Sequence, residues 1–586
     1  MPENFRGYPQ RVSNLQYFTR NLLNRRVLPD NSFRCPGLTP GYQEVKKVAF
    51  QISKSAAAYL FRRHDPLLWV VFIGGTGTGK STLFNAFCGT PISAVGVERP
   101  KTQGAILYVH EKDIENHELG KTSSKIDEDK WSEKPLEGMP TVLTVVKHRN
   151  DRLRRLVVCD TPDIDSVTLE NREIAEDLYL LADIVVFVAS QEKYADDVPY
   201  QFLKRVLKEE KPYFVLLNKA TLSLLPGEVT GLLREQGINV DPKRLWLVPY
   251  LPVPQVARGL ENTGFRDFID SFFDEVRPER ISDLRHRQQK RSASCLLSEI
   301  DNLLRLLGEE DQASKRWLRM LDQTFDSICK ELLEEERLRF SKESQRYIQV
   351  EIKRLFSRYD FLAGPRRIIT GILSVPLRTL GVKMSRAASD RRRLLDEILE
   401  ELDPSPILGT VERFNRMVLE QLSPSDVSAP LFSALRREET VLTPEMIKER
   451  LYQQRKSLAG WLEDTFQKFA QGISREKRIG MYSTSILWGI LIIVLETVIG
   501  GGFSFVDAVV DSALAPFLTK GAVELFAYRE IQRIARELSS RYEEGLVSTI
   551  REQRNRFARC LESLQIPEEA IEKLKDLRRL VERESA

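Results

Sequence analysis

Residues 67–85 constrain the fold more than any other part of the chain. Residues 67–73 are an apolar run typical of a buried strand, Gly-x-x-x-x-Gly-Lys-Ser follows directly at 74–81, and residues 82–85 open a helix. A strand, this glycine spacing and a helix together define a phosphate-binding P-loop. Glycine lets backbone N–H groups approach phosphate oxygens, and the helix N-terminus adds free donors and the positive end of its dipole.

Two side chains of the P-loop and one carboxylate farther along are predicted to hold phosphate and Mg²⁺. Lys80 is expected to place its charge against the β- and γ-phosphates, and the Ser81 hydroxyl to ligate Mg²⁺. A second apolar run, residues 156–159, ends in Asp160, where P-loop proteins carry the acid that holds Mg²⁺ directly or through water. The loop residues predicted to bind the nucleotide are Gly75, Thr76, Gly77, Thr78, Gly79, Lys80, Ser81 and Thr82.

The charge balance and the cysteines narrow the range of partners and compartments. The chain has 586 residues, and 88 basic side chains against 84 acidic ones give a net charge of +4. Such a balance lacks the overall basic footprint of a nucleic-acid-binding protein, so no nucleic-acid partner is expected. The six cysteines are scattered singly and no signal peptide opens the sequence. Both features favour a reducing cytoplasmic setting.

The patterning divides the chain into an α/β part and an all-α part. Residues 65–278 alternate strand-like and helical segments, which predicts a mostly parallel sheet. Later segments lack proline over long stretches and repeat apolar residues at helical spacing, which predicts a bundle of long helices. The expected divisions are an N-terminal helical segment 1–64, a P-loop domain 65–278, a helical stalk 279–480, a candidate membrane segment 481–518 and C-terminal stalk helices 519–586.

Two apolar segments before Asp160 indicate the class of P-loop domain. Residues 142–147 and 153–159 flank the turn sequence Asn150-Asp151, and we expect them to pair as a β-hairpin. An antiparallel hairpin at this place resembles the GTPase class related to translation factors and is not expected in a RecA-like ATPase core. The predicted fold class is therefore an α/β P-loop G domain, mostly parallel with one antiparallel hairpin, followed by an all-α long-helix bundle.

Residues 98–102, Glu-Arg-Pro-Lys-Thr, resemble the switch I loop of Era-like and dynamin-like GTPases. In that group a threonine after a proline-bearing loop covers Mg²⁺ and the γ-phosphate, and Thr102 is the matching residue. The resemblance therefore implies that Thr102 is a metal ligand and, with Lys80, a catalytic residue. Arg99 is a further catalytic candidate, as a contact that neutralises charge.

Residues 213–219 read as a strand that ends in Asn218-Lys219 and match the first half of the GTPase NKxD motif. The resemblance implies that Asn218 braces the P-loop and that Lys219 stacks on the base. Thr221 occupies the position of the aspartate that reads guanine, and its hydroxyl lacks the bidentate carboxylate. Guanine specificity and an ATPase both stay open at this point.

Three further positions depart from the pattern of these GTPases. Asp163 stands where a glycine is usual, and Ile164 stands where Ras-type enzymes keep a water-orienting glutamine. Because a hydrophobic side chain cannot orient water, we expect slow intrinsic hydrolysis unless a group is supplied in trans by dimerisation. Gly77 replaces the P-loop asparagine of potassium-dependent relatives, so potassium activation is not implied.

Two segments of the helical part predict contact with a membrane. Residues 486–505 are twenty residues with one charge, Glu496, which is about the length that crosses a bilayer core of ~30 Å. Three glycines at 500–502 suit a re-entrant hairpin, and a helix buried in the bundle is the alternative. Residues 361–393 combine a short apolar stretch with arginines, a pattern suited to the interface of an anionic leaflet.

The sequence as a whole resembles a bacterial dynamin-like GTPase, with a G domain on a helical stalk and a membrane-binding tip. This resemblance implies GTP and GDP as ligands, Mg²⁺ as cofactor, a homodimer formed through the G domains, and a place on the cytoplasmic face of a membrane. One alternative is a soluble Era-like regulatory GTPase whose helical half binds protein or RNA. Another is a nucleotide-binding scaffold with little turnover.

Overall fold

The computed structural model describes residues 33–93, 104–114, 124–127, 144–166, 168–190, 197–221, 224–249, 264–339, 404–472 and 525–585. The chain forms two compact units that are interleaved in sequence. Unit 1 comprises Met1–Arg34, Gly41–Gly308 and Ile566–Ala586, and unit 2 comprises Cys35–Pro40 and Glu309–Gln565. The predicted Thr102, Arg99 and both predicted membrane segments lie outside the described residues.

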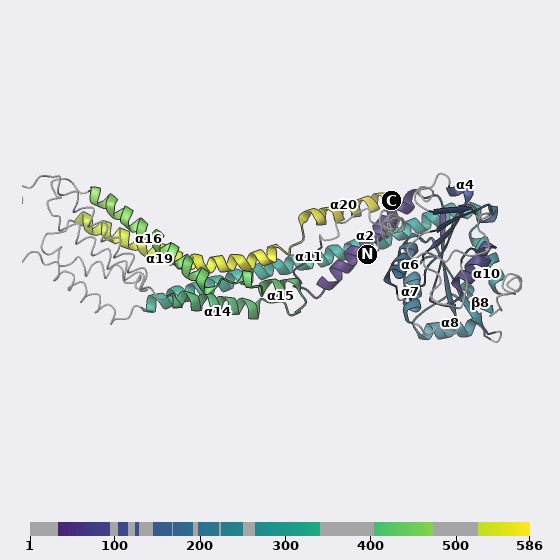
Figure 1. The fold of residues 1–586 in the computed structure, drawn as a ribbon, viewed down its shortest axis with the longest axis horizontal. Helices are drawn as coiled ribbons and strands as arrows, with labels where there is room; N and C mark the ends of the chain where they lie inside the picture. The colour runs from purple at the N-terminus through teal and green to yellow at the C-terminus, as the bar shows by residue number, and fades with distance from the viewer. Residues whose placement is uncertain are drawn as a thin grey trace, which may run out of the picture. The chain divides into compact units, whose positions relative to one another are not determined.

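Unit 1 is built on an eight-stranded sheet with the strand order β3-β4-β2-β5-β1-β6-β7-β8 (Figure 1). All neighbouring strands are parallel except β2 and β5, which are antiparallel. The predicted mostly parallel sheet with one antiparallel pair is thereby confirmed. The strands are β1 (Leu68–Gly74), β2 (Ile106–His110), β3 (Ser124–Asp127), β4 (Thr144–His148), β5 (Leu156–Asp160), β6 (Ile184–Ser190), β7 (Tyr213–Ala220) and β8 (Leu245–Pro249).

The predicted hairpin between residues 142–147 and 153–159 is wrong in its pairing. β4 and β5 are not neighbours, because β2 lies between them, parallel to β4 and antiparallel to β5. The connection at 149–155 contains a 3₁₀ turn, η2 (Asp151–Leu153), and is long enough to cross two strand spacings of about 4.8 Å each. β2 is buried along its whole length, so a central position satisfies its apolar side chains better than an edge.

Helices cover both faces of the sheet, and each face has its own apolar core. Side chains on one face of the strands pack against α2, α6, α7 and α8. The other face packs against α3, α10 and the start of α11, where the ring of Phe72 contacts those of Phe84 and Phe87, and Phe87 contacts Phe272. The helices are α2 (Tyr42–His64), α3 (Lys80–Cys88), α4 (Glu111–Ile114), α6 (Leu169–Leu181), α7 (Asp197–Lys208), α8 (Pro226–Glu235), α10 (Gly264–Glu275) and α11 (Pro278–Arg339), with the 3₁₀ turn η4 (Pro242–Arg244).

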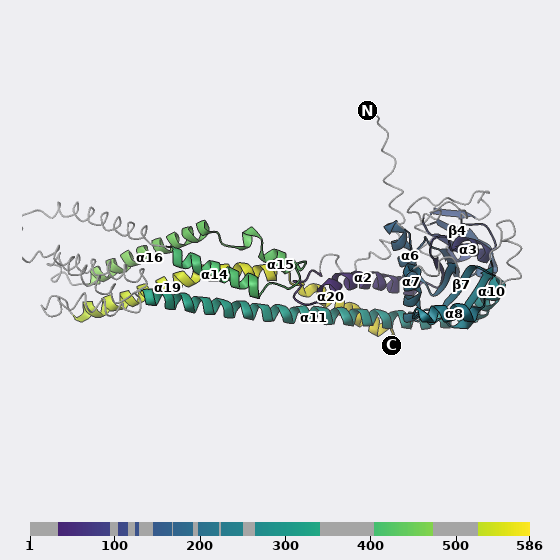
Figure 2. The same cartoon turned by 90° about the horizontal axis from the view of Figure 1, so that it is seen from below.

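Three helices from distant parts of the sequence lie side by side in unit 1 (Figures 1 and 2). They are α2, the first half of α11 and the C-terminal α20 (Glu568–Ser585). Arg578 of α20 pairs with Asp301 of α11 at 2.7 Å, and Arg63 of α2 pairs with Glu584 of α20. Helices α2 and α20, which are far apart in sequence, thus meet beside α11.

The secondary structure described in unit 2 is helical and includes the second half of α11. The remaining elements are α14 (Ser405–Gln421), α15 (Pro430–Leu435), η7 (Glu438–Thr440), α16 (Pro444–Gly472) and α19 (Leu525–Glu562). They share one apolar core, in which Phe414 of α14 meets Phe557 of α19. The carboxylate of Glu310, 1% exposed, accepts hydrogen bonds from the backbone N–H groups of residues 37–39 and from the Thr39 hydroxyl. The predicted bundle of long helices is confirmed.

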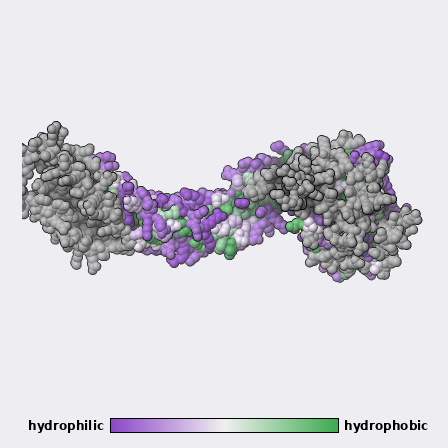
Figure 3. All heavy atoms as spheres, viewed as in Figure 1, coloured by the Kyte–Doolittle hydropathy of each residue, from purple (hydrophilic) through white to green (hydrophobic). Residues whose placement is uncertain are grey.

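The described helices of unit 2 present a mostly hydrophilic surface in the view of Figure 3. Within the described ranges, no helix combines the length and the apolar content that crossing a bilayer requires.

Candidate nucleotide-binding site

The site lies at the carboxyl edge of the central parallel strands. β1 leads into the P-loop, β5 ends at Asp160, and β7 carries Asn218 near its end. Phe72 of β1 is in register with Asp160, and Ser190 of β6 is in register with Asn218. Because these strands are parallel, their carboxyl ends meet at one edge, which is where open α/β sheets bind ligands.

Glycine is required at two positions of the P-loop. Gly77 and Gly79 have φ values of +75° and +83°, in the left-handed region that favours glycine. A Cβ on Gly79 would also lie 2.2 Å from the Asn218 side-chain nitrogen. That Asn218 nitrogen donates to the Thr78 carbonyl at 2.8 Å. The predicted loop residues 75–82 therefore occupy the turn and the first turn of α3, and Asn218 holds the loop against β7.

Lys80 is buried and surrounded by acceptors. Its Nζ donates to Asp160 Oδ1 at 2.9 Å and to the Thr161 carbonyl, and Asp163 Oδ1 lies 3.8 Å away. Burial opposes the charged form, but the carboxylates of Asp160 and Asp163 outweigh it, so the pKa of Lys80 is raised. The ammonium is therefore kept charged at the point where a P-loop holds phosphate oxygens.

Asp160 accepts hydrogen bonds from two serine hydroxyls, of which only that of Ser81 was predicted from the sequence. Its Oδ2 accepts hydrogen bonds from the Ser81 hydroxyl at 2.7 Å and from the Ser93 hydroxyl at 2.8 Å. Asn85 of α3 positions Ser93, since its Oδ1 accepts from the backbone N–H groups of residues 92 and 93 and its Nδ2 donates to the Ser93 carbonyl. Asn85 and Ser93 were not predicted as site residues, and the serine carries no motif that would mark it.

The residues after Asp160 close the other side of the loop. Asp165 Oδ1 accepts from both the backbone N–H and the hydroxyl of Thr76, at 2.6 Å each. Burial raises the pKa of Asp163, and this carboxyl faces Lys80. Ile164 is 5% exposed and packs in the apolar core on one face of the sheet. Asp165 is a further residue that was not predicted, although the acid-rich run 160–165 after a strand was a signal for it.

The residues predicted to contact the base lie at and after the end of β7. Lys219 follows Asn218 on β7 with a positive φ of 57°, a conformation that is uncommon for a non-glycine residue, and it lies where the pairing of β7 with β8 is irregular, between Leu217 and Ala220. Thr221 lies two residues after Lys219 and is exposed. Its position in sequence puts a hydroxyl, and no carboxylate, beside the Asn-Lys pair.

The donors around Asp160 fit the magnesium ion that a P-loop implies. Mg²⁺ prefers hard oxygen ligands and is commonly held in P-loop proteins through one or two carboxylates, hydroxyls and phosphates. Asp160 and Ser81 supply these oxygens, and Ser93 adds a hydroxyl on the same carboxylate oxygen. Thr102, the third predicted ligand, and Arg99 lie in the undescribed stretch that follows Ser93.

The site geometry and a match of sequence agree on the class of domain. Residues 69–219 match the family model described as 50S ribosome-binding GTPase. This segment contains the P-loop, Asp160 and Asn218-Lys219, and it is a GTPase domain of the P-loop type that the motifs predicted. Comparison with curated proteins gives no match.

Solved structures similar to the chain include bacterial dynamins and Era GTPases. Two chains from work on an oligomerised bacterial dynamin pair, described as sensing and tethering membranes, are 12% and 13% identical, with TM-scores of 0.38 and 0.41. Each comparison covers 99% of this chain and 96% of the other. Era bound to MgGDPNP and 16S ribosomal RNA nucleotides, and Aquifex aeolicus Era bound to GDP·AlF4⁻, are each 16% identical over 36% of this chain, with a TM-score of 0.23. They cover 57% and 56% of the Era chains. The class of the domain rests on the family match and the site geometry.

Proposed function

We propose that the chain is a membrane-associated, dynamin-like GTPase in which the nucleotide state of unit 1 changes the position of the helices of unit 2. The observation that carries this proposal is the continuity of α11. The helix begins three residues after α10 of the GTPase domain and continues for 62 residues, from unit 1 into unit 2. A helix shared in this way gives both units a common element through which a change in one can bias the other.

In this proposal the residues around Asp160 bind GTP and Mg²⁺. Lys80 exchanges its contact with Asp160 for phosphate oxygens, which frees Asp160 and Ser81 to hold the metal. The bound ion would neutralise charge that develops on the transferred phosphate. Thr102 closes over the metal and the γ-phosphate, and Arg99 adds a positive charge. Both follow Ser93, whose hydrogen bond to Asp160 ties the start of this segment to the site.

Hydrolysis by the isolated chain is proposed to be slow. Ile164 is packed in the core, so its side chain has no polar atom to orient water and no freedom to leave without exposing apolar surface. A second copy of the GTPase domain would supply the missing group. The specific activity should then rise with protein concentration, and a constant specific activity over a wide concentration range would exclude activation by dimerisation.

The first experiment is a nucleotide-binding panel. GTP, GDP, ATP and xanthosine nucleotides are titrated calorimetrically against the full chain, which also decides whether the site prefers guanine although Thr221 replaces the usual aspartate. Lys80→Ala should lower affinity for the preferred nucleotide roughly a hundredfold or more, because two or more charged hydrogen bonds are lost. Ser81→Ala should weaken only the Mg²⁺-dependent part of binding, and Lys243→Ala, an exposed lysine away from the loop, should change nothing. Full affinity in Lys80→Ala would refute the site.

The second experiment separates membrane attachment from a soluble role. The full chain is sedimented with anionic vesicles, at low and high salt, with and without GTP. Serine at Leu491, Ile492 and Ile493 should release the protein from vesicles of any composition, because insertion of this run is hydrophobic. If the chain stays in the supernatant throughout, or if the variant unfolds without lipid, the soluble regulatory GTPase is the better description.

A further inference from the structure

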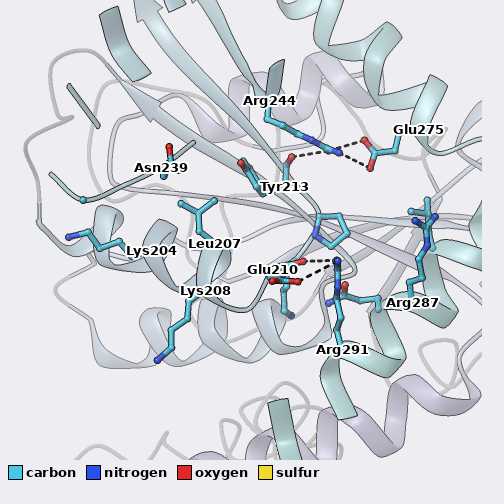
Figure 4. Close-up of a pocket in the computed structure, with 15 residues that line it drawn as sticks. Lys204, Leu207, Lys208, Glu210, Tyr213, Asn239, Arg244, Glu275, Arg287 and Arg291 are labelled. Carbon is cyan, nitrogen blue, oxygen red and sulfur yellow. Dashed lines mark hydrogen bonds and ion pairs between the residues drawn. The ribbon is translucent and has the colours of Figure 1, made fainter. Parts of the chain in front are cut away.

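An open groove lies at the end of the sheet opposite the P-loop, and we call it the α7–α11 groove. It has a volume of about 870 Å³ and is lined by the last turns of α7, the first residues of β7, and the early turns of α11 (Figure 4). Tyr213 opens β7 at this groove, whereas Asn218 reaches the P-loop five residues later. At about 3.3 Å per residue, the groove is roughly 16 Å from the nucleotide site along the strand.

The groove carries a concentration of positive charge that the chain as a whole lacks. Six basic and two acidic side chains line it, so its excess of positive charge equals that of the whole chain. Both acidic side chains already form ion pairs with arginines that line the groove. Glu275 forms a two-point ion pair with Arg244 at 2.8 and 3.2 Å, and Glu210 pairs with Arg291 at 3.6 Å.

Lys211 is buried and donates to the carbonyls of Tyr179 and Ala182. The three other cations lack an acidic partner among the residues that the structure describes. Lys204 and Lys208 are four residues apart on α7, and Arg287 is four residues before Arg291 on α11. Figure 4 shows Lys204 and Lys208 on one rim of the groove and Arg287 and Arg291 on the other, with Tyr213 between them. Like charges at this helical spacing repel each other, so each rim is stabilised when an anion binds.

Helix stability does not account for this arrangement. Lys208 lies in the last turn of α7, where a cation favours the helix dipole. Lys204 lies one turn farther in, and Arg287 lies in the third turn of α11, and the dipole effect fades within one turn of a helix end.

We propose that the α7–α11 groove binds a ligand with at least two phosphate groups, one held at the Lys204 and Lys208 rim and one at Arg287. A phosphate can carry close to two charges and accept from several donors, so one group can neutralise a pair of cations, which a single carboxylate cannot. Arginine adds a planar fork of donors that matches phosphate oxygens. The groups belong either to a soluble polyphosphate or to the headgroups of an anionic phospholipid.

The test uses the full chain saturated with GDP and Mg²⁺, so that the P-loop cannot take up the probe. Inorganic triphosphate is titrated by calorimetry into the wild type, the double variant Lys204→Gln with Arg287→Gln, and the control Lys290→Gln. Lys290 is an exposed lysine of α11 that does not line the groove. The double variant should bind about tenfold more weakly or worse, whereas the control and the charge-preserving Lys204→Arg should bind like the wild type.

A parallel measurement identifies the source of the phosphate groups. The same four proteins are sedimented with vesicles of phosphatidylcholine alone and of phosphatidylcholine with phosphatidic acid. Loss of triphosphate binding in the double variant, with vesicle binding unchanged, assigns the groove to a soluble polyphosphate. Selective loss of binding to the anionic vesicles assigns it to lipid headgroups. If the double variant matches the wild type in both assays, or if Lys290→Gln loses as much as the double variant, the proposal is overturned.

Discussion

The close approach of Gly79 to Asn218 predicts how substitutions at these two positions combine in their effect on stability. Gly79 has a φ of +83°, and a Cβ there would lie 2.2 Å from the Asn218 nitrogen that donates to the Thr78 carbonyl at 2.8 Å. Gly79→Ala therefore does two things at once: it places alanine in a left-handed conformation, and it displaces Asn218 from its hydrogen bond. Asn218→Ala removes the same hydrogen bond without the strain.

The cost of the left-handed conformation and the cost of the lost hydrogen bond can be separated, because both single variants lose the same hydrogen bond. The left-handed conformation costs alanine about 1–2 kcal/mol, and loss of a buried hydrogen bond that leaves a carbonyl unpaired costs about 1–3 kcal/mol. Gly79→Ala should lower the free energy of unfolding by the sum of both, and Asn218→Ala by the second alone. In the double variant the hydrogen bond is lost only once, so its cost should fall about 1–3 kcal/mol short of the sum of the single variants.

The assay must report on unit 1 alone. Hydrogen exchange of the β1 and β7 amides, followed by mass spectrometry across a urea series on the full chain, gives the opening free energy of these strands. The control is Gly89→Ala, since Gly89 also has a positive φ, +80°, but no atom within 4 Å of a Cβ built on it. Gly89→Ala should combine additively with Asn218→Ala. Additivity of Gly79→Ala with Asn218→Ala to within about 0.5 kcal/mol would refute the reasoning.

Two further variants test the charges of unit 1. Asp163→Gly should raise affinity for GTP more than for GDP, because the Asp163 carboxylate lies 3.8 Å from Lys80 Nζ, where a terminal phosphate would bind; an equal gain for both nucleotides would contradict this. Burial lowers the pKa of Lys211 from 10.5 to about 8, so the unfolded chain binds more protons between these values and the free energy of unfolding should rise as pH increases from 8 to 10.5. This lysine should contribute a rise of up to about 3 kcal/mol. In urea unfolding of Lys211→Met the rise should be absent from the pH profile. A profile equal to that of the wild type would show that the lysine stays charged.

Local sequence was enough to predict the parts of the site that depend on short-range geometry. The P-loop, the acid at the end of β5 and the asparagine near the end of β7 each follow a strand directly, and parallel strands bring such positions to one edge. Residue roles that depend on tertiary contacts were missed. Asp165 contacts Thr76 across 89 positions of sequence, and Ser93 reaches Asp160 only because Asn85 holds its backbone.

The pairing of β4 and β5 shows the same limit in the fold. Two apolar segments around Asn150-Asp151 satisfy every local rule for a hairpin. The competing partner, β2, lies some 40 residues upstream of this turn, and local pattern carries no information about which strand fills the space between. The roles of Thr102 and Arg99 remain predictions, since they lie outside the described residues.

The interleaving of the two units has a consequence for how the protein is made. Residues 35–40 belong to unit 2, where Glu310 accepts hydrogen bonds from residues 37–39, and α20 belongs to unit 1, beside α2 and α11. During translation the sheet of unit 1 emerges first, but α20 is made only after the whole of unit 2. Unit 1 therefore completes its packing only after unit 2 has been synthesised. Neither unit can be isolated as one uninterrupted fragment, and a stop codon after α19 would leave unit 1 unfinished although every residue of its nucleotide site had been made.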